Sequence, residues 1–262
     1  MLNDIMLGQY VPGDSFLHRL EPRAKLVALF ALIAAVFLMN NGKQALALSL
    51  FTFFLMVKSG APLRMFLQSL KPILPIVLFT FLMHLFTTQG EAFYTLWGFH
   101  LTFAGAIKGF LLGWRLALLM LLSSLLTLTT SPVALTDALE TLLRPLRVIG
   151  LPSGEIAMMM TIALRFVPTL IEEADRVMRA QQARGADFST GGVKKRVQSF
   201  VPVLVPLFVS AFRRADELAM AMEARCYHGG DHRTRMKHTK FGRLDAIAAI
   251  FLGIILLVIW AL

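Results

Sequence analysis

Residues 101–129 have the sequence LTFAGAIKGFLLGWRLALLMLLSSLLTLT, which is apolar enough for the interior of a lipid bilayer. A helix needs about 20 mostly apolar residues to cross the hydrocarbon core. This run is long enough to cross, contains no carboxylate and carries two charges, Lys108 and Arg115. We expect Lys108 to extend to the membrane surface and Arg115 to contact a neighbouring helix. A polar contact with a substrate or partner is the alternative role for both.

Four further apolar runs lie on either side of it, at residues 26–39, 44–57, 72–86 and 246–262. The chain is 56% hydrophobic and 16% charged, with a mean hydropathy of +0.67, which excludes an ordinary soluble domain. Several runs are shorter than a full span, so their helices must extend into neighbouring polar residues. The sequence therefore predicts an all-α integral membrane protein with about five transmembrane helices.

The charged residues lie between and beyond the apolar runs. There are 26 lysines and arginines against 16 aspartates and glutamates, a net charge of +10. Basic loops beside membrane spans mark the cytoplasmic side, so this excess does not require nucleic acid as a partner. We expect a multi-pass bacterial plasma-membrane protein with a cytoplasmic N-terminus and the C-terminus outside. Cys226 is the only cysteine, so nothing indicates an oxidising compartment.

Residues 131–245 separate the fourth and fifth runs and are only partly apolar. Their pattern predicts helices at residues 132–147, 153–184 and 194–225, the two longer ones bent at prolines. Each longer helix begins moderately apolar and ends polar. The expected domains are a cytoplasmic N-terminal segment (1–25), a membrane domain of about four spans (26–130), a cytoplasmic domain of long helices (131–245) and a last span (246–262).

A near-duplicate pair of charged segments lies in the two longer helices, at residues 172–185 and 213–226. In each segment an Ala-Asp pair precedes an Ala-Arg pair at the same spacing: Ala174-Asp175 before Ala183-Arg184, and Ala215-Asp216 before Ala224-Arg225. Repetition of a polar helix with a terminal arginine indicates one binding element, present twice, that contacts two similar partners.

The two helix ends hold the candidate binding residues. An arginine in the last turn before glycine is an ordinary helix ending, because the cation offsets the helix dipole and glycine adopts the left-handed cap. A matched pair of such ends favours docking, because a helix end in a partner's groove needs a small residue for close approach and one permanently charged anchor. The candidates are Ala183, Arg184, Gly185, Ala224, Arg225 and Cys226.

The side chains needed for catalysis or ion coupling are largely missing from the sequence. The only carboxylate across the first four runs is Glu91, expected in an outer loop, which disfavours a proton- or sodium-driven carrier. The chain has no Gly-x-x-x-x-Gly-Lys-Ser/Thr loop and no His-Glu-x-x-His. His228, His232 and His238 could bind a metal, but a solvated basic loop is the favoured interpretation. We expect no enzymatic activity, no cofactor and no metal, with energy supplied by a partner.

Three groups of motifs carry a family resemblance. They are Gly8-Gln9-Tyr10-Val11-Pro12-Gly13-Asp14-Ser15 with His18, Leu20-Glu21-Pro22-Arg23 and Lys25-Leu26; Leu164-Arg165-Phe166-Val167-Pro168 with Gln182-Ala183-Arg184-Gly185-Ala186-Asp187-Phe188; and Ala221-Met222-Glu223-Ala224-Arg225. Together they resemble the transmembrane T component of energy-coupling factor transporters, which are ATP-driven importers of vitamins and metals. Two residues depart from that family's pattern, Glu21 in place of aspartate and Cys226 in place of glycine.

The resemblance implies a non-catalytic scaffold with two crossed coupling helices. Their ends would dock in grooves on two ATPase subunits, which bind the ATP, and the scaffold would move a separate substrate-binding S component in the membrane for vitamin or micronutrient uptake. With cysteine replacing glycine, the second helix end is expected to be tighter or capped differently.

Two other classes of protein fit parts of the pattern. A permease that itself forms the substrate path of another ABC importer would use Glu173-Ala174 and Gly185 as a loose coupling-loop signature. The lack of polar residues in the first four runs disfavours it. A membrane-bound enzyme or lipid transferase is disfavoured by the missing intramembrane carboxylates and metal ligands.

Overall fold

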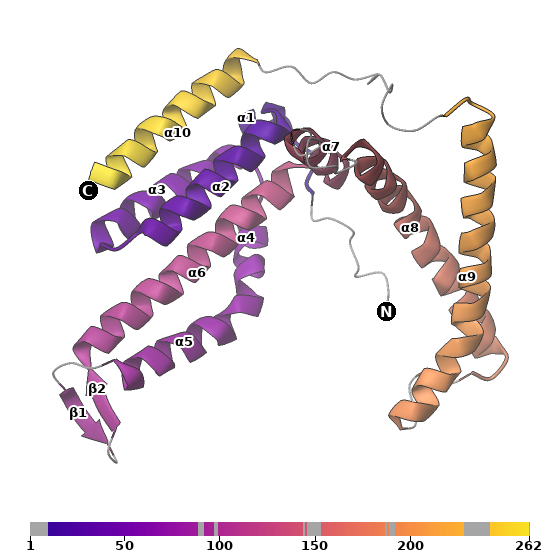
Figure 1. The fold of residues 1–262 in the computed structure, drawn as a ribbon. Coiled ribbons are helices and arrows are strands. Elements are labelled where there is room, and N and C mark those ends of the chain that lie inside the picture. The colour runs from indigo at the N-terminus through magenta and orange to yellow at the C-terminus, as the bar shows by residue number, and fades with distance from the viewer. Residues whose placement is uncertain are drawn as a thin grey trace. The chain divides into compact units, whose positions relative to one another are not determined.

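The structure, a computed structural model, describes residues 10–88, 92–96, 99–143, 145, 153–186, 188, 192–227 and 242–261. The chain divides into two compact units, one that includes Leu139–Met236 and one made of Gly8–Ala138 with Lys237–Leu262. Most of the described residues are helical (Figure 1). Glu91 and the three C-terminal histidines discussed above lie outside the described residues.

The unit of Gly8–Ala138 and Lys237–Leu262 contains the apolar helices, which we call the membrane unit. Its helices are α1 (Phe16–Arg19), α2 (Pro22–Leu38), α3 (Gly42–Ser59), α4 (Leu63–Leu70), the 3₁₀ turn η1 (Lys71–Ile73), α5 (Leu74–Thr87), α6 (Phe103–Thr129), the start of α7 (Pro132–Leu143) and α10 (Arg243–Ala261). All five predicted apolar runs are helical over most of their length.

Local sequence explains where several of these helices begin and end. Pro22 opens α2, where its missing N–H costs no hydrogen bond. Asn41 and Gln44 form a reciprocal capping box at the start of α3. Gly60 ends α3 with φ +71°, a left-handed conformation that glycine adopts without strain. Of these signals, the capping box starts α3 shortly after α2 ends at Leu38, so α2 and α3 are separate helices joined by a short turn.

The third apolar run differs most from its prediction. The helical path begins earlier, with α4, and passes through η1 at Lys71–Ile73 before α5 begins. The following segment, expected to be a loop, contains an antiparallel hairpin of β1 (Ala92–Leu96) and β2 (Phe99–Thr102). This hairpin is a local exception to the predicted all-α class. The other regular elements among the described residues are helices.

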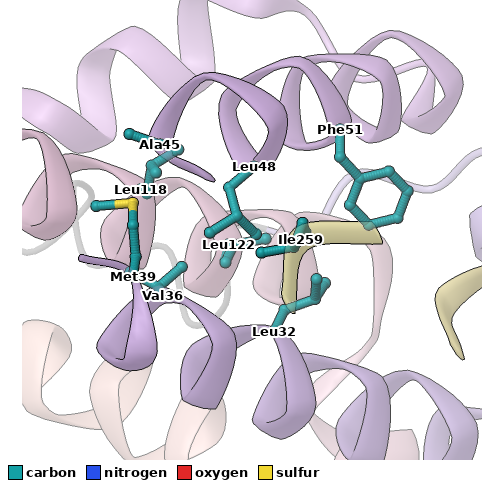
Figure 2. Packing of buried hydrophobic residues seen from close by; sticks show 9 residues of the cluster. All are labelled: Leu32, Val36, Met39, Ala45, Leu48, Phe51, Leu118, Leu122 and Ile259. Atoms are coloured by element: carbon teal, nitrogen blue, oxygen red, sulfur yellow. The ribbon is translucent and has the colours of Figure 1, made fainter. Parts of the chain in front are cut away.

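The core of the membrane unit is formed where α2, α3, α6 and α10 meet. Figure 2 shows its side chains: Leu32 and Val36 from α2, and Met39 directly after it; Ala45, Leu48 and Phe51 from α3; Leu118 and Leu122 from α6; and Ile259 from α10. A second buried cluster places Phe66 of α4 against Leu125 and Leu128 of α6. Residues from both ends of the sequence therefore share one packed interior.

Helices α5 and α6 approach unusually closely along a row of glycines. Gly105, Gly109 and Gly113 recur at every fourth position of α6 and are all buried. A Cβ added at Gly105 would lie 2.5 Å from the carbonyl oxygen of His84, and one at Gly113 would lie 2.9 Å from Val77 Cγ1. Small residues at this spacing allow two helix backbones to pack in direct contact. We call this row the glycine seam.

Four helical stretches in the described chain are long and apolar enough to cross a membrane: Leu63–Thr87, Phe103–Thr129, Gly154–Ala183 and Arg243–Trp260. Helices α2 and α3 have 17 and 18 residues and are not in this set. These findings support an integral membrane protein, and the total of about five spans stays a prediction. Arg115 donates a hydrogen bond to the carbonyl of Met39 at the end of α2, so the expected helix contact is confirmed.

The other unit is dominated by two long helices, α8 (Ser153–Ala183) and α9 (Val193–Glu223). Both predicted long helices are thus confirmed, with Pro168 inside α8 and Pro202 and Pro206 inside α9. Helix α9 ends two residues before its predicted limit, because the residues after Glu223 form a turn. The shorter predicted helix at 132–147 corresponds to α7.

Candidate functional site

Helices α8 and α9 pack against each other and cross, as Figure 1 shows. At their contact the Glu173 carboxylate of α8 accepts hydrogen bonds from Ser210 Oγ at 2.6 Å and from Arg214 Nη2 at 2.9 Å. Glu173 lies in the polar half of α8, beyond the apolar stretch at its start. Both donors lie on α9, so the carboxylate joins the two helices through two hydrogen bonds.

The end of α8 is a complete Schellman cap. The N–H of Ala186 donates to the carbonyl of Gln181 at 2.9 Å, and that of Gly185 donates to Gln182 at 2.9 Å. Gly185 has φ +89°, the left-handed conformation that this motif requires. The cap satisfies the last carbonyls of the helix and leaves Arg184 exposed at its tip.

The end of α9 repeats that cap with a different residue. The N–H of Tyr227 donates to the carbonyl of Met222 at 3.1 Å, and that of Cys226 donates to Glu223 at 2.9 Å. Cys226 occupies the left-handed position with φ +57°. The expectation of a different cap is therefore wrong, because the hydrogen-bond pattern of the helix end is retained although cysteine has a Cβ. Holding a non-glycine residue there costs about 1 kcal/mol.

The six predicted binding residues lie in two groups of three, one at the end of α8 and one at the end of α9, and Figure 1 shows these two helix ends apart from each other. All six are exposed: Ala183, Arg184, Gly185, Ala224, Arg225 and Cys226. Each group thus presents a small residue and an arginine at the tip of a capped helix. Exposed tips of this kind are suited to insertion into a groove on another protein.

An apolar groove opens beside the crossing of the two helices. It has a volume of about 510 Å³. It is lined from α8 by Ile162, Phe166 and Leu170, and from α9 mainly by Ala215, Leu218 and Met222. Arg214, which donates to Glu173, also lines this groove, so the polar contact borders the groove.

A buried polar cluster in the membrane unit was missed by the sequence analysis. Lys25 Nζ of α2 donates to the carbonyl of Thr129 at 3.0 Å and to Thr130 Oγ1 at 3.3 Å, at the end of α6. Asp245 of α10 accepts a hydrogen bond from the N–H of Glu21 at 2.8 Å. The cluster joins the starts of α2 and α10 to the end of α6. The sequence marks these residues as charges at the ends of apolar runs, but it does not pair them.

In the part of the chain that the structure describes, no group of three or more histidine, cysteine, aspartate or glutamate side chains is placed to hold a metal ion. The polar clusters that are present, at Glu173 and at Lys25, are ion pairs and hydrogen bonds between helices. Their arrangement suits structural joining of helices.

Residues 13–236 match the family of cobalt transport proteins called CbiQ. The chain is also 51% identical over 248 residues to the energy-coupling factor transporter transmembrane protein EcfT of Ruminiclostridium cellulolyticum, covering 94% of this chain and 92% of that protein. The EcfT of Acidaminococcus fermentans is 49% identical and covers 100% and 96% of the two chains. That of Bacillus subtilis is 48% identical and covers 90% of each.

Proposed function

Because this chain belongs to the CbiQ and EcfT family of membrane transport proteins, we propose that it is the scaffold (T) subunit of an ATP-driven importer. In this role it binds no ATP itself and hydrolyses nothing. It transmits ATP binding and hydrolysis in two ATPase subunits to a separate substrate-binding S component in the membrane. The proposed cargo is a vitamin or another micronutrient.

The observation that carries this proposal is the matched pair of helix ends. Helices α8 and α9 both finish in an exposed Ala-Arg pair, followed by the same Schellman cap. Two ATPase subunits form two similar grooves, so a scaffold that binds both needs two similar ends. Arginine is suited to each end because its guanidinium is always charged and offers several donors in a rigid plane.

The proposed topology places the N-terminus, the charged second half of α8 and the polar end of α9 on the cytoplasmic side, where ATP is available, although Gly154–Ala183 is long and apolar enough to cross a membrane. Basic residues before α2 and between α3 and α5 support this orientation. The apolar first half of α8 would lie at the membrane boundary, and its charged second half would lie in the cytoplasm. The residues of α8 and α9 then connect the bilayer to the ATPases.

The test is a pull-down of the tagged chain from its native cells, scored for bound ATPase subunits. Arg184→Ala and Arg225→Ala should each weaken ATPase binding by about tenfold, as expected for loss of one charged anchor. The double variant should bind none. Failure of the unmodified chain to bring down any ATPase would contradict the proposed function.

Two arginines elsewhere on the same helices provide matched controls. Arg179 of α8 and Arg213 of α9 are exposed but precede the helix ends. Arg179→Ala and Arg213→Ala remove the same charge and should leave ATPase binding within about twofold of the unmodified chain. Equal losses from the controls and the end variants would show that net charge, and not the helix ends, determines binding.

A further inference from the structure

The two charged segments contact each other through the same position of the repeat. Glu173 and Arg214 are 41 residues apart, which is also the separation between Ala183-Arg184 and Ala224-Arg225. When two copies of one motif touch through equivalent positions, an approximate two-fold axis passes through the contact. Identical charges would repel on such an axis, and here the copies carry a carboxylate and a guanidinium.

We propose that Glu173, Ser210 and Arg214 form a pivot that sets how α8 and α9 cross, and so fixes the separation of the two arginine-bearing ends. The docking role of those ends rests on the proposed function, whereas the geometry of the pivot does not. Glu173 and Arg214 are positioning residues in this proposal. They act on the helix ends only through the crossing.

The hydrogen bonds at the pivot specify the register of the two helices. Ser210 and Arg214 are one turn apart on the same face of α9, and each donates to a different oxygen of the Glu173 carboxylate. A shift of α9 by one turn, about 5.4 Å, would move one donor to the place of the other and leave the carboxylate with at most one of its two bonds. Two bonds to one carboxylate therefore select one register.

The apolar groove explains why a polar contact governs the crossing. An open groove of about 510 Å³ borders the pivot, with Phe166 and Leu218 in its apolar lining and Arg214 at its polar edge. In a close-packed pair, interdigitated side chains would fix the crossing angle along the whole contact. Side chains do not fill this part of the crossing, so we assign the choice of angle to the pivot.

The pivot can be tested through the distance between the two helix ends. Cys226 is the only cysteine and is exposed at the end of α9, and Gln182 is exposed in the last turn of α8. Spin labels on Cys226 and on Gln182→Cys, in the full-length chain in lipid nanodiscs, report this distance by pulsed electron paramagnetic resonance. Glu173→Ala should broaden the distance distribution about twofold, because more crossing angles become populated.

Charge exchange separates the pivot from a general structural defect. In the double variant Glu173→Arg with Arg214→Glu the ion pair is reversed, and the distribution should narrow to nearly its original width. Glu172→Ala removes the neighbouring exposed carboxylate of α8 and should leave the width unchanged. An unchanged distribution in Glu173→Ala would overturn the proposal, as would failure of the reversed pair to restore it.

The measurement needs no ATPase, so its outcome is independent of the docking experiment. If the unmodified chain binds no ATPase but Glu173→Ala broadens the distribution and the reversed pair restores it, the pivot stands and the proposed function fails. If ATPases bind through Arg184 and Arg225 but the distribution ignores Glu173, the proposed function stands and the pivot fails.

Discussion

The pairs α5–α6 and α8–α9 show two different ways to join long helices. In the first pair the glycine seam brings the backbone of α6 against that of α5 over several turns. In the second pair, polar contact occurs at Glu173, and an apolar groove lined by both helices borders it. The glycine seam fixes both the crossing angle of α5 and α6 and the distance between their axes. The contact at Glu173 fixes the register of α8 against α9 but leaves their crossing angle more easily changed.

The difference follows from the surroundings of each pair. Between helices in lipid, burial of large apolar side chains gives little advantage, because lipid tails are equally apolar, so close backbone packing through small residues is effective. The second halves of α8 and α9 are polar, and a charged hydrogen-bonded pair can join them without a core. We therefore expect the membrane unit to be rigid and the α8–α9 pair to be adjustable.

The largest effect should come from filling the glycine seam. Gly105→Leu places a side chain where even a Cβ would meet the carbonyl oxygen of His84. The clash should destabilise the membrane unit by about 3 kcal/mol, seen as loss of monodisperse protein in detergent and a lower Tm. Gly253→Leu is the control, because nothing lies within 4 Å of a Cβ at that position of α10. Equal stability of the two variants would contradict the close approach of α5 and α6.

Removing a buried polar contact in the membrane unit should cause an intermediate loss of stability. It also tests whether polar contacts between helices contribute little to stability in general. Lys25→Met removes the hydrogen bonds to Thr129 and Thr130 and leaves nearby Asp245 without its cation. Lys25 is only 8% exposed, so the loss should be about 2 kcal/mol. The measurement is the Tm in detergent, with Lys43→Met, at an exposed position of α3, as the control. A Tm unchanged by Lys25→Met would show that the buried hydrogen bonds of Lys25 do not stabilise the membrane unit.

The smallest effects should come from the two caps, which lie apart from both helix contacts. Gly185→Ala introduces a Cβ at φ +89° and should destabilise the end of α8 by about 1 kcal/mol, whereas Cys226→Gly should stabilise the end of α9 by a similar amount. Hydrogen exchange of the amides in the last turn should become about fivefold faster in the first variant and slower in the second. If the exchange rates rose in both variants, or fell in both, the result would contradict a left-handed cap shared by the two helix ends.

The sequence predicted individual helices better than contacts between them. Apolar runs locate α2, α3, α6 and α10, and the charge repeat locates the ends of α8 and α9, because those signals are local. The contact of Glu173 with Arg214 joins residues 41 positions apart, and helix periodicity does not reveal it. The Gly-x-x-x-Gly-x-x-x-Gly pattern of α6 was present in the sequence but says nothing about which helix it faces.

Two local differences also have physical reasons. Helix α4 was not predicted because Arg64 and Lys71 resemble loop charges, whereas the structure places Phe66 between them in a buried cluster. The cap at Cys226 was expected to differ from that at Gly185, but two backbone hydrogen bonds outweigh the strain of one left-handed cysteine. In both cases packing or hydrogen bonding overrides the preference of a single residue.

The polar cluster at Lys25 has a consequence for how the chain is made. Asp245 follows Glu21 by 224 residues, and α8 and α9 lie between them in the chain. The carboxylate that accepts the N–H of Glu21 is therefore absent until α10 has been made, after α8 and α9. Completion of the membrane unit must follow synthesis of α10, so a transcript truncated before residue 243 yields a protein that cannot close its own helical bundle.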